Sequence, residues 1–316
     1  MSAPAVEIAR EVTPQDVPRP RLSQSELEHL YARSDRRPAV YVAVAVTAAI
    51  GTMLVACAWP HPLILVAAAV LIGTLQHHFS IIHHESVHYL LFRSRRLNDV
   101  VGSIIAFATG FSMAYRTHHL AHHRRLGQDD DPDLDAYADY PTNRLGLVVD
   151  LARHLCGAAA IEQFLRQMQR ARALSKAGGG TSGAQILGIV ATQMILFALF
   201  ALAGHPWLYF VLWLLPLLTV AKTLAHFRSV VEHTVAVCCD GKPTRYRTIV
   251  CGPIEGFFFA PMNFNLHAEH HFYPAIPYYN LPQAFRILSQ DPTYHDVVRL
   301  DHGYLAYLLR DAVGTG

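Results

Sequence analysis

The chain has 316 residues, of which 52% are hydrophobic and 16% charged, and its formal net charge is +2. This composition is more apolar than that of an ordinary soluble domain, so it excludes a typical water-soluble globular protein. Crossing a membrane takes about 20 mostly apolar residues, and several stretches reach that length. We therefore expect an integral membrane protein that has no nucleic-acid partner.

The first 38 residues are polar, with Pro14, Pro18 and Pro20 spread among charged side chains. They lack the basic stretch followed by an apolar stretch that is typical of a cleaved secretory signal. This pattern predicts a polar cytoplasmic N-terminal tail over residues 1–38, with one short helix from Ser23 to Ala32.

Four apolar stretches are long enough to cross a membrane. They cover residues 39–58, 62–82, 184–203 and 207–225, and only a short turn separates the members of each pair. The sequence thus predicts four transmembrane helices in two hairpins. A further apolar stretch, Val100 to Tyr115, is shorter and holds two glycines and two serines. We expect it to be re-entrant or half-embedded.

Basic residues flank the predicted spans but are missing from the two hairpin turns. They are Arg33, Arg36, Arg37, Arg93, Arg95, Arg96, Arg166, Arg170, Arg172, Lys176 and Arg228. Short cytoplasmic loops are enriched in Lys and Arg. Both termini and the segment between the hairpins should therefore be cytoplasmic, and we expect the bacterial inner membrane as the location.

Histidines cluster beside the cytoplasmic ends of the predicted spans. His84 and His88 follow the second span four residues apart, which places them on one face of a helix. His233 follows the fourth span. Two H-x-x-H-H groups also occur, and in a helix each group projects three imidazoles from one face. These groups are His119, His122 and His123, and His267, His270 and His271.

Isolated histidines usually cap helices or fill a core. We expect only such a role for five of them: His61, His154, His205, His295 and His302. The repeated spacing of the clustered histidines instead indicates metal binding. Imidazole suits iron, zinc, copper and nickel alike. A catalytic zinc takes three protein ligands, so eight or nine converging histidines favour two metals.

Carboxylates near these histidines are candidates for holding the imidazoles by accepting their second N–H. The candidates are Asp129, Asp130, Asp131, Asp133, Glu85, Glu232 and Glu269.

Three boxes, "HESVH", "HHLAHHRRLGQDDDPD" and "NFNLHAEHHFYPAIPYYNLP", resemble those of the membrane fatty acid desaturase superfamily. The likeness covers the order of the boxes, their spacing around the hairpins, and the H-x-x-H-H-x-x-P-x-x-P-x-x-x-L-P run from His267 to Pro282. It implies an all-α integral membrane protein whose cytoplasmic helical cap carries the histidine boxes. We expect this membrane domain over residues 39–290 and a cytoplasmic C-terminal tail over 291–316.

The resemblance further implies a non-haem di-iron centre with O₂ as co-substrate. The implied ligands are His84, His88, His119, His122, His123, His267, His270 and His271, with His233 as the extra ligand that some members take after the last span. Some members space the first box as H-x-x-x-x-H, which makes His83 the rival of His84.

The implied activity is an oxygen-dependent oxidation that introduces a double bond into a fatty-acyl or lipid chain. Hydroxylation or another C–H oxidation of a lipid-like substrate, including alkene-forming decarboxylation, is the alternative. No haem-binding, flavin-binding or ferredoxin-like stretch occurs in the sequence. We therefore expect electrons from a separate ferredoxin, rubredoxin or cytochrome b5 with its reductase.

Two other interpretations compete with this one. "HESVH" also satisfies H-E-x-x-H, in which two helical histidines bind zinc and Glu85 is the base of a metalloprotease. That interpretation leaves both H-x-x-H-H groups unexplained. A non-catalytic metal-handling or haem-anchoring protein explains the clustering of histidines but not their repeated spacing.

Overall fold

The computed structural model describes residues 18–166, 182–238, 241–310 and 312–313. The chain divides into two compact units. The histidine unit comprises Met1–Arg33, Arg116–Leu147 and His226–Gly316, and the apolar unit comprises Ser34–Tyr115 and Val148–Ala225. Each unit is described by itself.

Four helical runs in the described residues are long and apolar enough to cross a membrane, which confirms the four predicted spans. They are α3 (Arg36–Ala58), α4 (Pro62–Val87), α9 (Gly183–Leu202) and the run Phe210–His233. The last run starts with a π-helical turn, η2 (Phe210–Leu214), and continues as α10 (Leu215–Leu218) and α11 (Val220–His233).

The ends of these helices follow from local sequence. His61 precedes α4, where its Nδ1 accepts a hydrogen bond from the Leu63 amide, and Pro62 occupies the first helical position. Ser182 and Gln185 form a capping box at the start of α9. α4 therefore begins at the predicted Pro62, and α9 begins one residue before the predicted Ala184.

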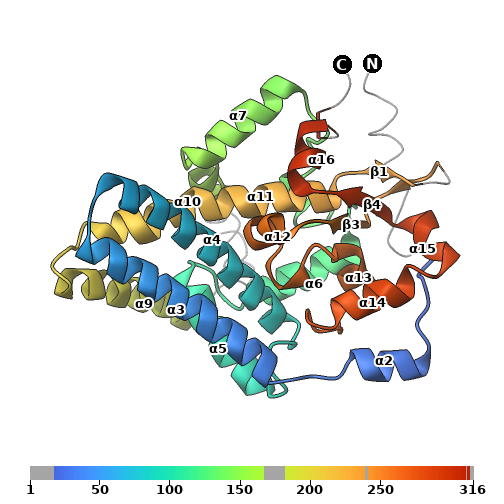
Figure 1. Ribbon diagram of the computed structural model, residues 1–316, viewed down its shortest axis with the longest axis horizontal. Coiled ribbons are helices and arrows are strands. Elements are labelled where there is room, and N and C mark those ends of the chain that lie inside the picture. Colours follow the sequence, from blue (N-terminus) through green and yellow to red (C-terminus); the bar gives the residue numbers. More distant parts are fainter. Residues whose placement is uncertain (1–17, 167–181, 239–240, 311, 314–316) are drawn as a thin grey trace. The chain divides into compact units, whose positions relative to one another are not determined.

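α5 (Arg95–Ala108) covers part of the stretch predicted to be re-entrant. Its 14 residues are too few to cross a membrane. Within the apolar unit it packs against α4 and α9 (Figure 1). Buried Asn98 ties its start to the preceding loop by accepting hydrogen bonds from the Leu91 and Phe92 amides.

The histidine unit is built from short elements. Its helices are α2 (Gln24–Leu30), α6 (Tyr115–Arg125, which starts at the unit boundary), η1 (Leu134–Ala136), α12 (Pro253–Phe259), η3 (Pro261–Asn263), α13 (His267–Phe272), α14 (Leu281–Leu288), α15 (Pro292–Val297) and α16 (Tyr304–Arg310). The described strands are β1 (Ala236–Val237) antiparallel to β2 (Pro243–Thr244), and β3 (Arg247–Val250) parallel to β4 (Arg299–His302). A mostly helical fold is thus confirmed, with two small strand pairs added.

The described part of the N-terminal segment is tied to the third histidine box. Ser23 caps α2, at the position where a short helix was predicted. The Tyr273 hydroxyl donates to the Pro20 carbonyl at 2.7 Å, and Asn280 Nδ2 donates to the Leu30 carbonyl at 2.8 Å. Residues 1–17 of the predicted tail lie outside the described residues.

Residues 292–310, predicted as part of a C-terminal tail, form α15, β4 and α16. Pairing of β4 with β3 sets Arg299 beside Arg247 and Asp301 beside Ile249. This pairing holds the end of the chain against the segment that follows α11.

Candidate metal centre

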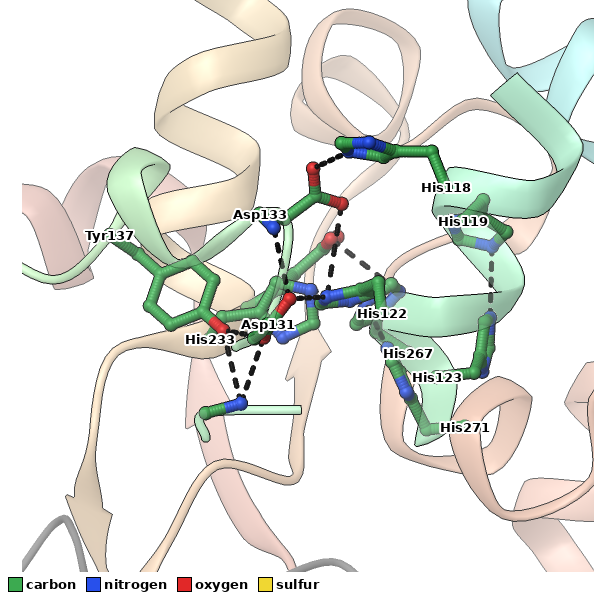
Figure 2. A network of polar contacts seen from close by, with 12 residues as sticks. His118, His119, His122, His123, Asp131, Asp133, Tyr137, His233, His267 and His271 are labelled. Atoms are coloured by element: carbon green, nitrogen blue, oxygen red, sulfur yellow. Dashed lines mark hydrogen bonds and ion pairs between the residues drawn. The ribbon is translucent and has the colours of Figure 1, made fainter. Parts of the chain in front are cut away.

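The second box lies on α6, and its histidines face into the histidine unit. His119 and His122 are buried. His123 Nε2 lies 2.9 Å from His119 Nε2, so these two rings, four residues apart, point at one small volume (Figure 2).

The third box forms α13, in which all six residues are buried. His271 Nε2 lies 3.0 Å from His267 Nε2, and His267 Nε2 lies 3.0 Å from His233 Nε2 at the end of α11. His270 Nε2 lies 3.1 Å from His123 Nε2. The two H-x-x-H-H groups and His233 therefore form one cluster within the histidine unit.

Two groups of potential ligand atoms stand out in this cluster. His119, His123 and His270 form one group, and His122, His233 and His271 form the other; within each group the atoms lie within 4.8 Å of one another. His267 adjoins the second group and also forms a group with Glu232 and His233. Two adjacent groups of imidazoles suit two metal ions.

The spacing of these nitrogens fits metal ligation. At a metal–imidazole distance of about 2.1 Å, two ligands that subtend about 90° at the metal have nitrogens about 3.0 Å apart. The Nε2 pairs of this cluster lie 2.9 to 3.1 Å apart. One Nε2 can take part in a single N–H···N hydrogen bond, yet His267 Nε2 lies 3.0 Å from both His233 Nε2 and His271 Nε2. Direct hydrogen bonds between the rings therefore do not account for this convergence, whereas a metal ion between them would.

Asp131 fixes the ring of His122 through a contact with its Nδ1. Its Oδ1 lies 2.9 Å from His122 Nδ1 and also accepts from the Asp133 amide, while its Oδ2 accepts from the Gly127 amide and the Tyr137 hydroxyl (Figure 2). A proton fixed on Nδ1 leaves Nε2 free as a metal ligand. Of the candidate carboxylates, Asp131 has the closest contact with an imidazole of the cluster.

Burial, the largest influence on Asp131, opposes ionisation, but the hydrogen bonds from His122, Tyr137 and Gly127 outweigh it and lower the pKa of the carboxyl. Asp131 is thus held as a carboxylate beside the histidines. The neighbouring acids differ: Asp133 pairs with half-exposed His118 at 2.7 Å, and Asp130 pairs with exposed Arg125.

Glu232, next to His233, approaches another imidazole. Its Oε2 lies 3.5 Å from His267 Nδ1, and its Oε1 accepts a hydrogen bond from the buried Tyr304 hydroxyl at 2.9 Å. Arg228, one turn earlier on α11, pairs with the same carboxylate at 3.2 Å. A fully buried carboxylate is thereby held beside Nδ1 of His267, the ring nitrogen that points away from the cluster.

Glu269, between the histidines of α13, contacts no imidazole in the described contacts. It accepts hydrogen bonds from the Thr248 hydroxyl on β3 at 2.7 Å and from the Tyr294 hydroxyl on α15. Burial raises the pKa of Glu269, against the opposing effect of these two donors. Its position anchors α13 to β3 and α15.

Two arginines that sequence analysis missed secure the end of α11. Arg247 is 2% exposed and donates to the Val231 and Thr234 carbonyls at 2.7 and 3.1 Å. Arg245 donates to the His233 carbonyl at 3.0 Å. The last carbonyls of a helix lack partners within it, and cations stabilise them. No spacing or motif in the sequence marks these two residues.

Gly127 sits where no other residue fits well. Its φ of +73° is a left-handed conformation, and a Cβ there would lie 2.2 Å from Arg245 Nε. The glycine lets the chain turn so that its amide reaches Asp131.

The first box lies in the apolar unit, at the end of α4. The rings of His84 and His88 are 4.8 Å apart, as expected for two residues on one helix face. The ring of His83 instead lies 5.6 Å from that of Tyr115. This arrangement favours His84 over His83 as the partner of His88.

Several isolated histidines have the structural roles that we expected. His61 caps α4, His154 bonds the carbonyl of Asp150 in the preceding turn, and His295 bonds the Ser289 carbonyl.

The sequence matches the family described as Fatty acid desaturase over residues 60–302. The chain belongs to the fatty acid desaturase family. The matched range contains every histidine assigned above to the three boxes, together with His233 and Tyr294.

Two curated relatives agree with this assignment. Dihydrorhizobitoxine desaturase of Bradyrhizobium elkanii is 29% identical over 262 residues, covering 76% of this chain and 70% of the relative. Beta-carotene ketolase of Paracoccus sp. (strain N81106 / MBIC 01143) is 25% identical over 233 residues, covering 71% of this chain and 80% of the relative. Membership of the desaturase family identifies the protein as a membrane oxidoreductase.

Proposed function

We propose that this desaturase-family protein is an oxygen-dependent di-iron oxidase that introduces a double bond into a fatty-acyl or lipid chain. The observation that carries the proposal is the convergence of buried imidazoles in the histidine unit, each presenting Nε2 to its neighbours. The family assignment supports a redox role for the metals that such a cluster would hold.

The proposed ligands in the histidine unit are His119, His122, His123, His233, His267, His270 and His271. His84 and His88 complete the proposed set on the strength of the family resemblance. Two bound irons would supply the redox chemistry for O₂ reduction. Desaturation removes two hydrogens from the substrate. With two further electrons and two protons, O₂ is then reduced to two waters.

The surrounding residues orient the ligands. Asp131 keeps the proton of His122 on Nδ1, and Glu232 lies behind Nδ1 of His267, so both rings offer Nε2 to a metal. Arg245 and Arg247 fix the end of α11 that carries His233. Positioning of this kind matters because small displacements of metal ligands are costly to catalysis.

A second outcome, hydroxylation or another C–H oxidation, is supported by the ketolase among the relatives. The same centre serves both outcomes, since the product depends on which hydrogen the substrate presents after the first abstraction. The electron donor is proposed to be a separate ferredoxin, rubredoxin or cytochrome b5 with its reductase.

The proposed topology follows from the flanking arginines and lysines. The spans form two hairpins, with both termini and the histidine boxes on the cytoplasmic side of a bacterial inner membrane. A tag at either terminus should be protected in sealed cells, whereas a label at Gly204 should react from outside. A terminus found outside would overturn this topology.

Expression in a host with a compatible ferredoxin or rubredoxin system, followed by lipid mass spectrometry, tests the reaction. Loss of two hydrogen atoms from an acyl chain means desaturation, and gain of one oxygen atom means hydroxylation. His270→Ala is the inactive control. An unchanged lipid profile, with iron bound and the donor reduced, would contradict a lipid substrate.

Glu85→Gln separates the oxidase from the zinc protease. A protease would lose essentially all activity while it keeps its metal, because glutamine cannot act as a base. The di-iron proposal expects a loss of about 10- to 100-fold in rate or metal retention, as for residues that support ligands.

A further inference from the structure

α7 (Arg144–Leu155) turns its apolar side outward. Asp150 and His154, one turn apart, pair with each other at 3.2 Å and are largely sheltered, with side chains 23% and 12% exposed. In contrast, Val148 is 61% exposed and Leu155 is 51% exposed. A helix at the surface of a soluble protein shows the reverse arrangement.

The helix that follows, residues 158–166, repeats the pattern. Ile161, Phe164 and Leu165 occupy positions i, i+3 and i+4 and therefore share one face. Each of them is more than half-exposed. Exposed apolar patches of this kind mark surfaces that meet a protein partner or a membrane.

The second of these helices lies beside the fourth membrane-spanning run, within the apolar unit. Lys222 Nζ donates to Gln163 Oε1 at 2.9 Å and also lies 4.9 Å from the centre of the Phe111 ring. A methyl group at Gly157 would lie 3.8 Å from Thr219 Cγ2. The exposed apolar patch is therefore adjacent to a helical run that is long and apolar enough to cross a membrane.

We propose that residues 148–166 form an in-plane membrane anchor, whose outward face lies at the boundary between lipid headgroups and acyl chains. The 12 residues of α7 and the nine described residues 158–166 are each too few to span a membrane, which takes about 20 residues. Amphipathic helices that lie in the interface bury an apolar face and keep charged side chains at the headgroups. Residues 148–166 likewise combine an exposed apolar face with half-exposed charged side chains.

The exposure of the patch matches that of a span. Val190 and Met194 of α9 are 52% and 61% exposed, and Phe164 is 58% exposed. Arg153 and Arg166 both pair with Glu162, and all three side chains are about half-exposed. Two cations for one anion suit the surface of a membrane that contains anionic lipids.

Spin-label accessibility tests this anchor. A variant in which the native cysteines are replaced by alanine is given Val148→Cys or Phe164→Cys, labelled with a nitroxide, and reconstituted in phosphatidylcholine–phosphatidylglycerol vesicles. Met194→Cys in α9 is the deep reference, and Ala138→Cys in an exposed loop is the aqueous reference. Iron content equal to that of the parent shows that each variant is folded.

The ratio of oxygen to nickel-chelate accessibility reports depth in the bilayer. We expect ratios at positions 148 and 164 several-fold above that at position 138 and below that at position 194. Ratios equal to that at position 138 would mean a water-exposed surface and would overturn the proposal. Low accessibility to both reagents, with dipolar broadening between chains, would assign the face to a second copy and would also overturn it.

Discussion

In α9 and α13 the usual relation between side-chain polarity and burial is reversed, in opposite ways. α9 is almost wholly apolar, yet among its residues only Phe200 is buried, and Leu202 at its end is 85% exposed. α13 carries three histidines and a glutamate, yet all six of its residues are buried. In a soluble protein both arrangements would be unfavourable, because apolar surface belongs inside and ionisable groups outside.

The two inversions have different explanations. Apolar side chains on α9 are stable when lipid surrounds them. Burial of polar side chains on α13 is stable only when each finds a partner. Glu269 has Thr248 and Tyr294, whereas the imidazole Nε2 atoms have mainly one another. The first inversion thus suits a membrane, and the second suits a metal site.

Removing a ligand should have the largest effect. His267→Ala or His122→Ala should abolish product and lower the iron content, because each ring lies within the converging cluster. Iron quantification and lipid mass spectrometry measure both. His295→Ala is the matched control, since His295 bonds only a backbone carbonyl in the described contacts, and it should retain iron and activity. Normal iron in His267→Ala would remove that residue from the centre.

An acid placed in the exposed face of α9 tests the other side of the comparison. Met194→Asp should cost roughly 3 kcal/mol in membrane insertion, the usual penalty for an acid near the centre of a span. The yield of membrane-integrated protein should fall accordingly, while Met194→Leu should leave it unchanged. Full integration of Met194→Asp would mean that this face does not meet lipid.

The support of His122 should matter less than the ligand itself. Asp131→Asn keeps the shape but removes the negative charge that holds Nδ1–H, so iron retention should weaken by about 10- to 100-fold. Competition with a chelator measures the change. Asp139→Asn, at an exposed site on the same loop, should have no effect. Equal retention in both variants would show that Asp131 does not support a ligand.

The smallest effect is expected from loss of the hydrogen bond between Tyr304 and Glu232, the carboxylate near His267 Nδ1. Tyr304→Phe removes the hydroxyl that donates to Glu232 and should lower the free energy of unfolding by about 1 kcal/mol. Tyr307→Phe, on the same helix, keeps the ring that lies over Arg247 and should change stability less. Denaturant unfolding of the two variants measures the difference, and an equal loss in both would show that the Tyr304 hydroxyl contributes nothing specific.

Sequence patterns predicted the spans and the histidines because both depend on local periodicity. The H-x-x-H-H spacing places three imidazoles on one face of a helix wherever that helix lies. Asp131 was one of several equal candidates, since a run of acids does not show which one turns inward. The structure distinguishes it by the hydrogen bonds of Gly127 and Tyr137.

Other supporting residues left no local signal. Arg247 reaches Val231 and Thr234, and Tyr294 reaches Glu269, across many intervening residues. Such contacts depend on how β3, β4 and α15 pack. The outward apolar face of α7 was missed for a different reason, because a stretch of this length is too short to be recognised as a span.

Metal analysis of the purified protein tests the central claim most directly. Protein from iron-replete cells, prepared without a histidine tag, should hold close to two irons per chain, and His123→Ala should lose both iron and O₂-dependent product. His123 is decisive because its ring lies between those of His119 and His270. Full occupancy by a single zinc with activity retained, or a His123→Ala variant with normal iron and product, would contradict the di-iron assignment.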